Sequence, residues 1–266
     1  MKKEELKILA RKIVKSLLIG KKENPGIKIA RKKYPIESLL KKYKNKYIPK
    51  EVVEKNKWIK ELMNPKYGPL IVKRKIGKSE RYIIKDKIGE SVRIMYHPKN
   101  WELAKEIITE CVKAGAHPSW TCGYSELEKE IMEISKIENL EELPTHTKSM
   151  LESIDVRIKI ESENDPTWEQ KIESWKFRAG MDIRQYMHEI LDKKKIRWVY
   201  IGWPFDKVAD YYKVGRKWYK KMIFDSIKES FSKKTIELAN FYEKALKGKD
   251  KVKIISITEE DPTNLE

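Results

Sequence analysis

The sequence has no apolar run of the length that a membrane-spanning helix needs, ~20 residues. The chain of 266 residues is 38% charged, and its mean hydropathy is −0.70. The first residues include Glu4 and Glu5 and lack a small-residue cleavage site, which does not fit a signal peptide. We therefore expect a cytoplasmic protein that does not enter a membrane.

Cysteine and glutamine are scarce. The two cysteines, Cys111 and Cys122, lack the spacing of a metal site, and we expect both to be buried thiols. The two glutamines contrast with abundant lysine, isoleucine and glutamate, a bias typical of thermophilic proteins.

The motifs of several enzyme classes are absent. The sequence contains no GxGxxG, no GxxxxGK[ST] and no HExxH, and no serine occupies a nucleophile elbow. The four histidines are scattered: His97, His117, His146 and His188. An acidic cluster of Glu161, Glu163 and Asp165 has the composition of a cation site, but it also fits a strand exit followed by a helix cap, which we prefer. We predict no catalytic residue, no metal ligand and no cofactor.

Acidic residues are scarce in the first third of the chain. Residues 1–87 contain 28 Lys and Arg against 9 Asp and Glu, so the net charge of +18 arises entirely there. Such asymmetry indicates a polyanionic partner, with nucleic acid ahead of an anionic membrane surface.

From residue 88 onward, strand-like and helical patterns alternate. Strands are predicted near residues 91–96, 116–122, 155–161, 196–203 and 252–257. Helices are predicted over residues 101–114, 125–136, 139–152, 167–194 and, in two segments, 215–247. This alternation predicts an α/β fold, a mostly parallel sheet with helices on both faces.

Residues 4–19 have the apolar spacing of a helix, and the following segment changes character. We call residues 21–87 the basic segment. It contains short basic helical patches and a possible hairpin around Gly77-Lys78. We predict a first helix in residues 1–20, a basic, partly irregular insertion over 21–87, an α/β domain over 88–258 and an acidic tail over 259–266.

Short motifs in this order resemble the thermophilic metallo-aminopeptidases of the aminopeptidase T and S type. Gly89-Glu90 precedes the first strand, and Ala114-Gly115-Ala116 follows the first helix of the α/β pattern. The stretches DVRIKIESEND (155–165) and RWVYIGWPFDKVADYY (197–212) also resemble that family. The resemblance covers the first helix and about residues 88–257. It implies that the chain corresponds to the amino-terminal domain of such an enzyme.

Two departures from the family pattern shape our hypothesis. The resemblance implies that paired metal ions are bound in the family's carboxy-terminal half, and no residue of this chain matches those ligands. Family members also pass almost directly from the first helix to the first strand. The basic segment therefore reads as an insertion.

We predict a non-enzymatic RNA-binding protein, ribosomal or ribosome-associated, with ribosomal RNA and a ribosomal subunit as partners and no small-molecule substrate. Clustered lysines contact phosphates, and aromatic side chains stack on unpaired bases. Local packing of these aromatics is an equally good interpretation. The predicted contact residues are Arg31, Lys32, Lys33, Lys41, Lys42, Tyr43, Lys44, Lys46, Tyr47, Lys57, Trp58, Lys73, Arg74 and Lys75.

Two alternatives remain open. The chain is a fragment or split subunit of a metal-dependent aminopeptidase that a second chain completes, or it is an interaction protein whose basic segment binds an acidic protein or a membrane. The membrane version is disfavoured because the segment lacks a sustained amphipathic face.

Overall fold

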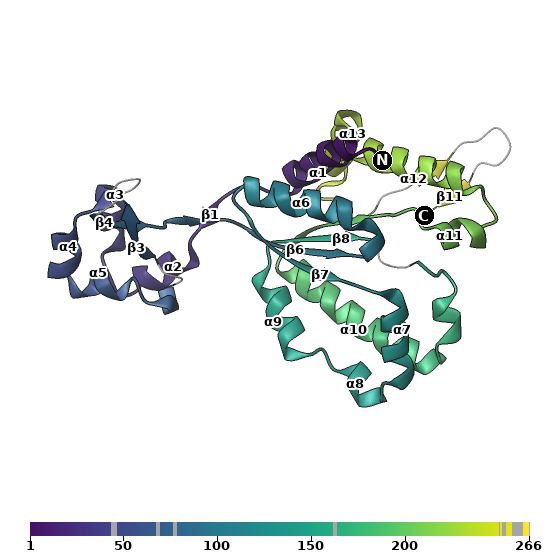
Figure 1. Cartoon of the computed structure of the whole chain (residues 1–266), viewed down its shortest axis with the longest axis horizontal. Helices are drawn as coiled ribbons and strands as arrows, with labels where there is room; N and C mark the ends of the chain where they lie inside the picture. The colour runs from purple at the N-terminus through teal and green to yellow at the C-terminus, as the bar shows by residue number, and fades with distance from the viewer. Residues whose placement is uncertain are drawn as a thin grey trace.

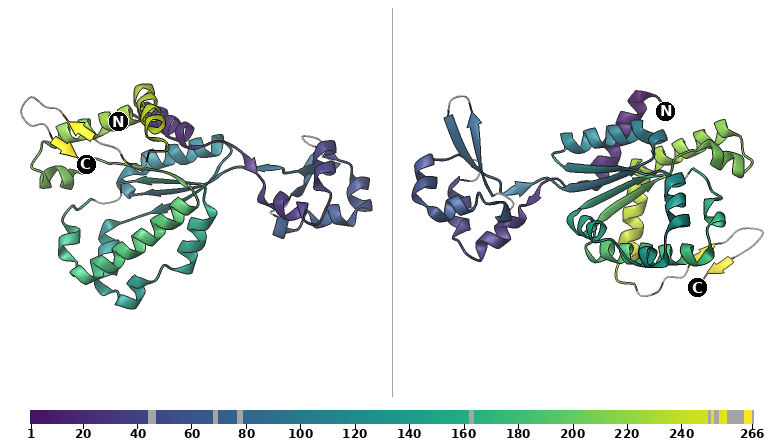
Figure 2. Two further views of the ribbon diagram at one scale, coloured as in Figure 1. Left: turned by 180° about the vertical axis from the view of Figure 1, so that it is seen from behind. Right: turned by 60° about the horizontal axis from the view of Figure 1, so that its bottom comes forward.

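The protein forms two parts joined by a narrow connection (Figure 1, Figure 2). The computed structural model describes residues 1–43, 47–67, 70–76, 79–161, 164–249, 251, 254–256 and 263–265. The smaller part is the basic segment. We call the larger part, residues 1–20 and 88–249, the α/β body.

A four-stranded parallel sheet forms the centre of the α/β body. Its strand order is β7-β6-β8-β9, and every neighbouring pair is parallel. The strands are β6 (Ser91–Tyr96), β7 (His117–Cys122), β8 (Val156–Ile160) and β9 (Arg197–Ile201).

Helices lie on both sides of this sheet, which confirms the predicted fold class (Figure 1). On one side lie α1 (Lys3–Leu17), α6 (Trp101–Lys113), α12 (Arg216–Ser230) and α13 (Lys233–Leu246). On the other side lie α7 (Ser125–Ile134), α8 (Ile137–Glu141), α9 (Thr145–Ser153) and α10 (Ser174–Lys193). Shorter elements follow strand ends: η2 (Pro98–Asn100), η3 (Trp168–Lys171) and α11 (Asp206–Tyr211).

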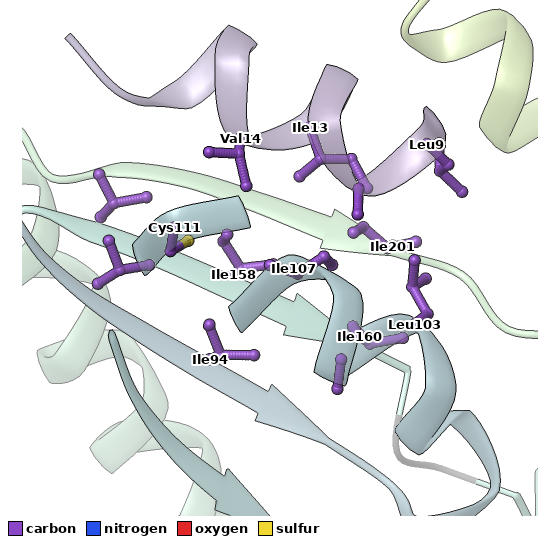
Figure 3. Close-up of a cluster of buried hydrophobic side chains, with 14 of the residues drawn as sticks. Leu9, Ile13, Val14, Ile94, Leu103, Ile107, Cys111, Ile158, Ile160 and Ile201 are labelled. Carbon is purple, nitrogen blue, oxygen red and sulfur yellow. The ribbon is translucent and has the colours of Figure 1, made fainter. Parts of the chain in front are cut away.

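The main core lies between the sheet and the helices α1 and α6 (Figure 3). Along β8, Val156, Ile158 and Ile160 are fully buried, and the residues between them are only partly so. This alternation follows from the two-residue period of a strand. Burial of each such side chain stabilises the fold by roughly 1.5–3 kcal/mol.

The basic segment encloses a separate core. Its buried side chains include Ile27, Ile36, Leu62 and Ile71, and none of them belongs to the core of the α/β body. The helices are α2 (Pro25–Arg31), α3 (Ile36–Tyr43), α4 (Lys50–Lys55) and α5 (Lys57–Glu61), with η1 (Pro65–Tyr67). A three-stranded antiparallel sheet contains β2 (Tyr47–Ile48), β3 (Ile71–Ile76) and β4 (Ser79–Ile84).

The predicted hairpin is confirmed by the antiparallel pairing of β3 with β4, although Gly77 and Lys78 lie outside the described residues. The connection to the α/β body consists of β1 (Lys22–Glu23) and β5 (Lys87–Ile88), which pair antiparallel.

Two local predictions were wrong. The expected helix 139–152 is divided into α8 and α9. Pro144 lies between them, and a proline disfavours the helical conformation of the residue before it. Cys122 is exposed because β7 is an edge strand, whereas Cys111 is buried as expected and burial raises the pKa of its thiol to about 12. The last predicted strand is present as β10 (Ile254–Ser256), which pairs antiparallel with β11 (Thr263–Leu265); residues 252, 253 and 257 lie outside the described residues.

Candidate functional site

Polar side chains gather at the carboxyl end of the parallel sheet, where open α/β sheets usually bind ligands. His97 directly follows β6 and is only 3% exposed. Its Nδ1 accepts a hydrogen bond from the backbone N–H of Lys99 at 3.1 Å. Asn100 fixes this turn, because its Oδ1 accepts from the His97 N–H at 2.9 Å and its Nδ2 donates to the Glu161 carbonyl at 2.6 Å. The ends of β6 and β8 are thereby tied together.

A second buried amide completes the cluster. Asn164 is 2% exposed, and its Nδ2 lies 3.5 Å from His97 Nε2. The same Nδ2 donates to Glu126 Oε1 at 2.9 Å. The rings of Tyr124 and Phe205 flank the imidazole, with centroids 5.8 Å and 5.1 Å away.

A cavity of about 490 Å³ is bordered by His97, Tyr124, Glu126 and Asn164. Its remaining walls come from the loop after β6 and from one face of α7, which presents Glu126, Leu127 and Glu130. The cavity therefore combines an imidazole, two carboxylates and an aromatic ring. Such a set suits a small polar ligand with an apolar part.

The imidazole of His97 is favoured in its neutral form. Burial lowers the pKa of His97, the nearby Glu126 carboxylate raises it, and Lys99 lowers it. Because Nδ1 accepts a hydrogen bond, the proton of the neutral ring resides on Nε2. In this tautomer His97 Nε2 and its neighbour Asn164 Nδ2, 3.5 Å away, are both donors, so Nε2 donates only to another acceptor, such as one supplied by a ligand.

The acidic cluster after β8 supports the capping interpretation. Asp165 Oδ1 accepts from the backbone N–H and the hydroxyl of Thr167, at 2.9 Å and 2.7 Å. Glu161 accepts from the Tyr200 hydroxyl, and Glu163 lies outside the described residues. Within the described ranges no three His, Cys, Asp or Glu side chains are arranged to hold one metal ion. The described residues thus do not fit a metal centre.

Several predicted contact residues in the basic segment are ion-paired. Arg31 binds Glu23 and Glu37, with a 2.5 Å contact to the latter. Lys33 lies 3.2 Å from Glu61, and Lys73 lies 2.7 Å from Glu80. The other described lysines and arginine of the predicted set are exposed: Lys32, Lys41, Lys42, Lys57, Arg74 and Lys75. Lys44 and Lys46 lie outside the described residues.

The aromatic residues of that set differ in their surroundings. Tyr43 and Trp58 pack against the core of the basic segment, and Trp58 stacks on Tyr34 with ring centroids 5.6 Å apart. Tyr47 is 45% exposed and lies 4.5 Å beneath the Arg81 guanidinium. Local packing therefore accounts for two of the three aromatics.

The sequence analysis did not identify the cavity beside His97. Asn100, Glu126 and Asn164 are far apart in the sequence, and the fold brings them to one place. The available signal was their position just after strands whose carboxyl ends meet at one edge.

Comparisons with known proteins bear on these observations. Residues 63–233 match the family described as thermophilic metalloprotease (M29). No curated protein matches the chain. One similar solved structure is wild-type AmpT from Thermus thermophilus, at 10% identity and a TM-score of 0.43. That similarity covers 53% of this chain and 38% of the AmpT chain, so the chain spans well under half of that relative.

No helix in the described part of the chain is long and apolar enough to span a membrane.

The prediction of a non-enzymatic, RNA-binding ribosomal protein was wrong, as was the choice of RNA and a ribosomal subunit as partners. It was drawn from net charge, which measures attraction to any polyanion and does not identify one. The structure also shows that glutamates of the basic segment pair with several of its cations. The contact role of the individual basic residues stays a prediction. Because the family match extends over more than half of the sequence, the chain belongs to the thermophilic metalloprotease family M29.

Proposed function

We propose that this chain is the amino-terminal part of a metal-dependent aminopeptidase and that the metal ligands are supplied from outside residues 1–266. The match of residues 63–233 to the M29 family carries this proposal. The motifs around Gly89-Glu90 and Ala114-Gly115-Ala116 support the assignment to the amino-terminal part. A cytoplasmic location stays a prediction from the sequence.

Within this proposal, the cavity beside His97 is the ligand-contacting surface of the chain. It lies at the carboxyl end of the parallel sheet, and the neutral imidazole offers a hydrogen-bond donor at Nε2 beside the carboxylates of Glu126 and Glu130. Such groups can bind and orient a peptide. We derive no bond-breaking step from them, because the described residues do not fit a metal centre.

The test compares the isolated chain with the assembly that contains it in its source cells. Hydrolysis of leucine p-nitroanilide is measured for both, with Zn²⁺, Co²⁺ or Mn²⁺ added and with a chelator as control. We expect no hydrolysis by the isolated chain and chelator-sensitive hydrolysis by the assembly. Metal-dependent hydrolysis by the isolated chain would show that the ligands lie within it, and hydrolysis by neither sample would reject the proposed function.

The contribution of the cavity is tested in the same assembly with His97→Ala. We expect a higher KM with the assembly intact, because the substrate loses a hydrogen bond. His117→Ala is the matched control, since His117 is exposed at the opposite end of the sheet. An unchanged KM for His97→Ala would contradict the ligand-contacting role of the cavity.

A further inference from the structure

Two arginines lie side by side on the face of the parallel sheet that points away from α1 and α6. Arg93 of β6 and Arg157 of β8 are direct partners in the strand register. Their neighbours Val92, Ile94 and Ile158 point to the opposite face and into the main core. The two guanidinium groups therefore emerge together on the second face.

Among the described residues, neither guanidinium has an acidic partner. Arg93 Nη2 donates to Thr121 Oγ1, while Arg93 Nε is buried and has no hydrogen-bond partner in the described part of the chain. Arg157 Nη2 contacts the sulfur of Met95 at 3.8 Å. No carboxylate among the residues that the structure describes forms an ion pair with either arginine. Buried charges are normally paired, so this arrangement lacks a counter-charge.

The electrostatics of the pair agree with the geometry. Burial lowers the pKa of the Arg157 guanidinium, and the positive charge of Arg93 lowers it further. Burial also lowers the pKa of Arg93. An anion between the two groups would relieve this repulsion.

Exposed aromatic side chains lie on the same face, in the adjoining strand β9. Trp198 is 52% exposed and Tyr200 is 46% exposed. Trp198 is the register partner of Arg157, and Tyr200 is that of Lys159, whose Nζ lies 5.4 Å from the Tyr200 ring. The cationic pair thus borders a half-exposed aromatic surface, one side of which meets the His188 ring of α10, with its centroid 6.2 Å from that of Trp198. The carboxylate of Glu161, which follows β8, accepts a hydrogen bond from the Tyr200 hydroxyl.

We propose that Arg93 and Arg157 bind the carboxylate or phosphate group of a small ligand, whose apolar part packs on Trp198 and Tyr200. Guanidinium groups match these oxyanions with two parallel hydrogen bonds. The site is on a sheet face, apart from the cavity beside His97. It does not depend on the proposed peptidase function.

The test is isothermal titration calorimetry of the full chain at constant ionic strength. The probes are inorganic phosphate, N-acetylphenylalanine and N-acetylphenylalaninamide. We expect saturable binding of phosphate or of the free acid, and none of the amide. Binding of the acid identifies a carboxylate ligand with an apolar part, and binding of phosphate alone identifies a phosphate ligand.

Variants assign the binding to the arginine pair. We expect Arg157→Met to weaken binding about tenfold or more, and Arg157→Lys and Arg93→Lys, which keep the charge, to weaken it through loss of the paired donors. Arg81→Met is the matched control, because it removes one guanidinium from the basic segment. Absence of saturable binding to either oxyanion, or equal affinity of wild type and all three site variants, would overturn the proposal.

Discussion

A single buried carboxylate connects three elements at the amino end of the parallel sheet. Glu90 is 2% exposed, and its Oε2 accepts from the backbone N–H groups of Ile19 and Gly20, at 2.9 Å and 3.1 Å. Its other oxygen pairs with Arg197 of β9. Glu90 thereby fixes the chain just after α1 against the sheet, although about 70 residues separate them in sequence.

Glu90→Ala is expected to destabilise the protein by about 2–4 kcal/mol, because it leaves two backbone donors and Arg197 without their acceptor. Urea unfolding followed by circular dichroism measures the change. Glu54→Ala is the matched control, since Glu54 forms an exposed pair with Lys50 and its loss costs about 0–1 kcal/mol. Equal effects of the two substitutions would contradict the structural role of Glu90.

The ionised carboxylate of Asp165 contributes to the stability of the folded protein, and this contribution is lost in strong acid. Hydrogen bonds from the side chain and backbone of Thr167 lower the pKa of Asp165 from 3.8 to about 2. Because the folded pKa lies below the unfolded one, this contribution is complete above pH 3.8 and is lost as the pH falls through about 2.

Asp165→Ala is therefore expected to cost about 1–2 kcal/mol at pH 7, and the difference from wild type should vanish near pH 2. Urea unfolding of both proteins between pH 2 and pH 7 provides the measurement. A difference that stays constant over this range would show that the carboxylate charge does not contribute.

At the scale of elements, glycine permits a close approach between two loops of the α/β body. A Cβ on Gly89, between β5 and β6, would lie 1.9 Å from the carbonyl oxygen of Gly115, between α6 and β7. Gly115 itself has φ +79°, a left-handed conformation that favours glycine. The motif residues that carry the family resemblance thus have a packing role.

Gly89→Ala should destabilise the α/β body by about 1–3 kcal/mol, because the backbone of β6 or of the Gly115 loop must move to admit the methyl group. Thermal unfolding tests this expectation. Gly202→Ala is the control, since no heavy atom lies within 4 Å of its added Cβ. A neutral Gly89→Ala would show that the two loops yield without cost.

The main core of the α/β body and the core of the basic segment share no buried residue. The chain passes between them through β1 and β5, where Glu23 faces Lys87 and Lys22 faces Ile88. The two ends of the basic segment are therefore adjacent, and a two-residue Asn-Gly turn is able to join paired antiparallel strands.

Replacement of residues 24–86 by Asn-Gly should leave the α/β body folded, with a cooperative thermal transition and its far-ultraviolet spectrum retained. The control is the same replacement combined with Ile158→Ala, which is expected to lower stability by about 2–5 kcal/mol through a cavity in the main core. A shortened chain without a cooperative transition would show that the body depends on the basic segment.

Most strands and helices of the α/β body could be predicted from the sequence pattern. The runs SVRIMY and DVRIKI predicted β6 and β8 because apolar and β-branched residues there alternate with polar ones. The alternation of strands and helices predicted the parallel sheet. Pro144 was the available signal that α8 and α9 are separate.

Which polar residues lie next to one another could not be predicted from the sequence pattern. His97, Asn164 and Glu126 come from separate loops and helices, and the parallel register alone brings Arg93 beside Arg157. The physical reason is that local propensities determine secondary structure, whereas long-range packing determines which side chains become neighbours. Net charge is a property of composition, and for that reason it predicted an RNA partner that the family assignment did not support.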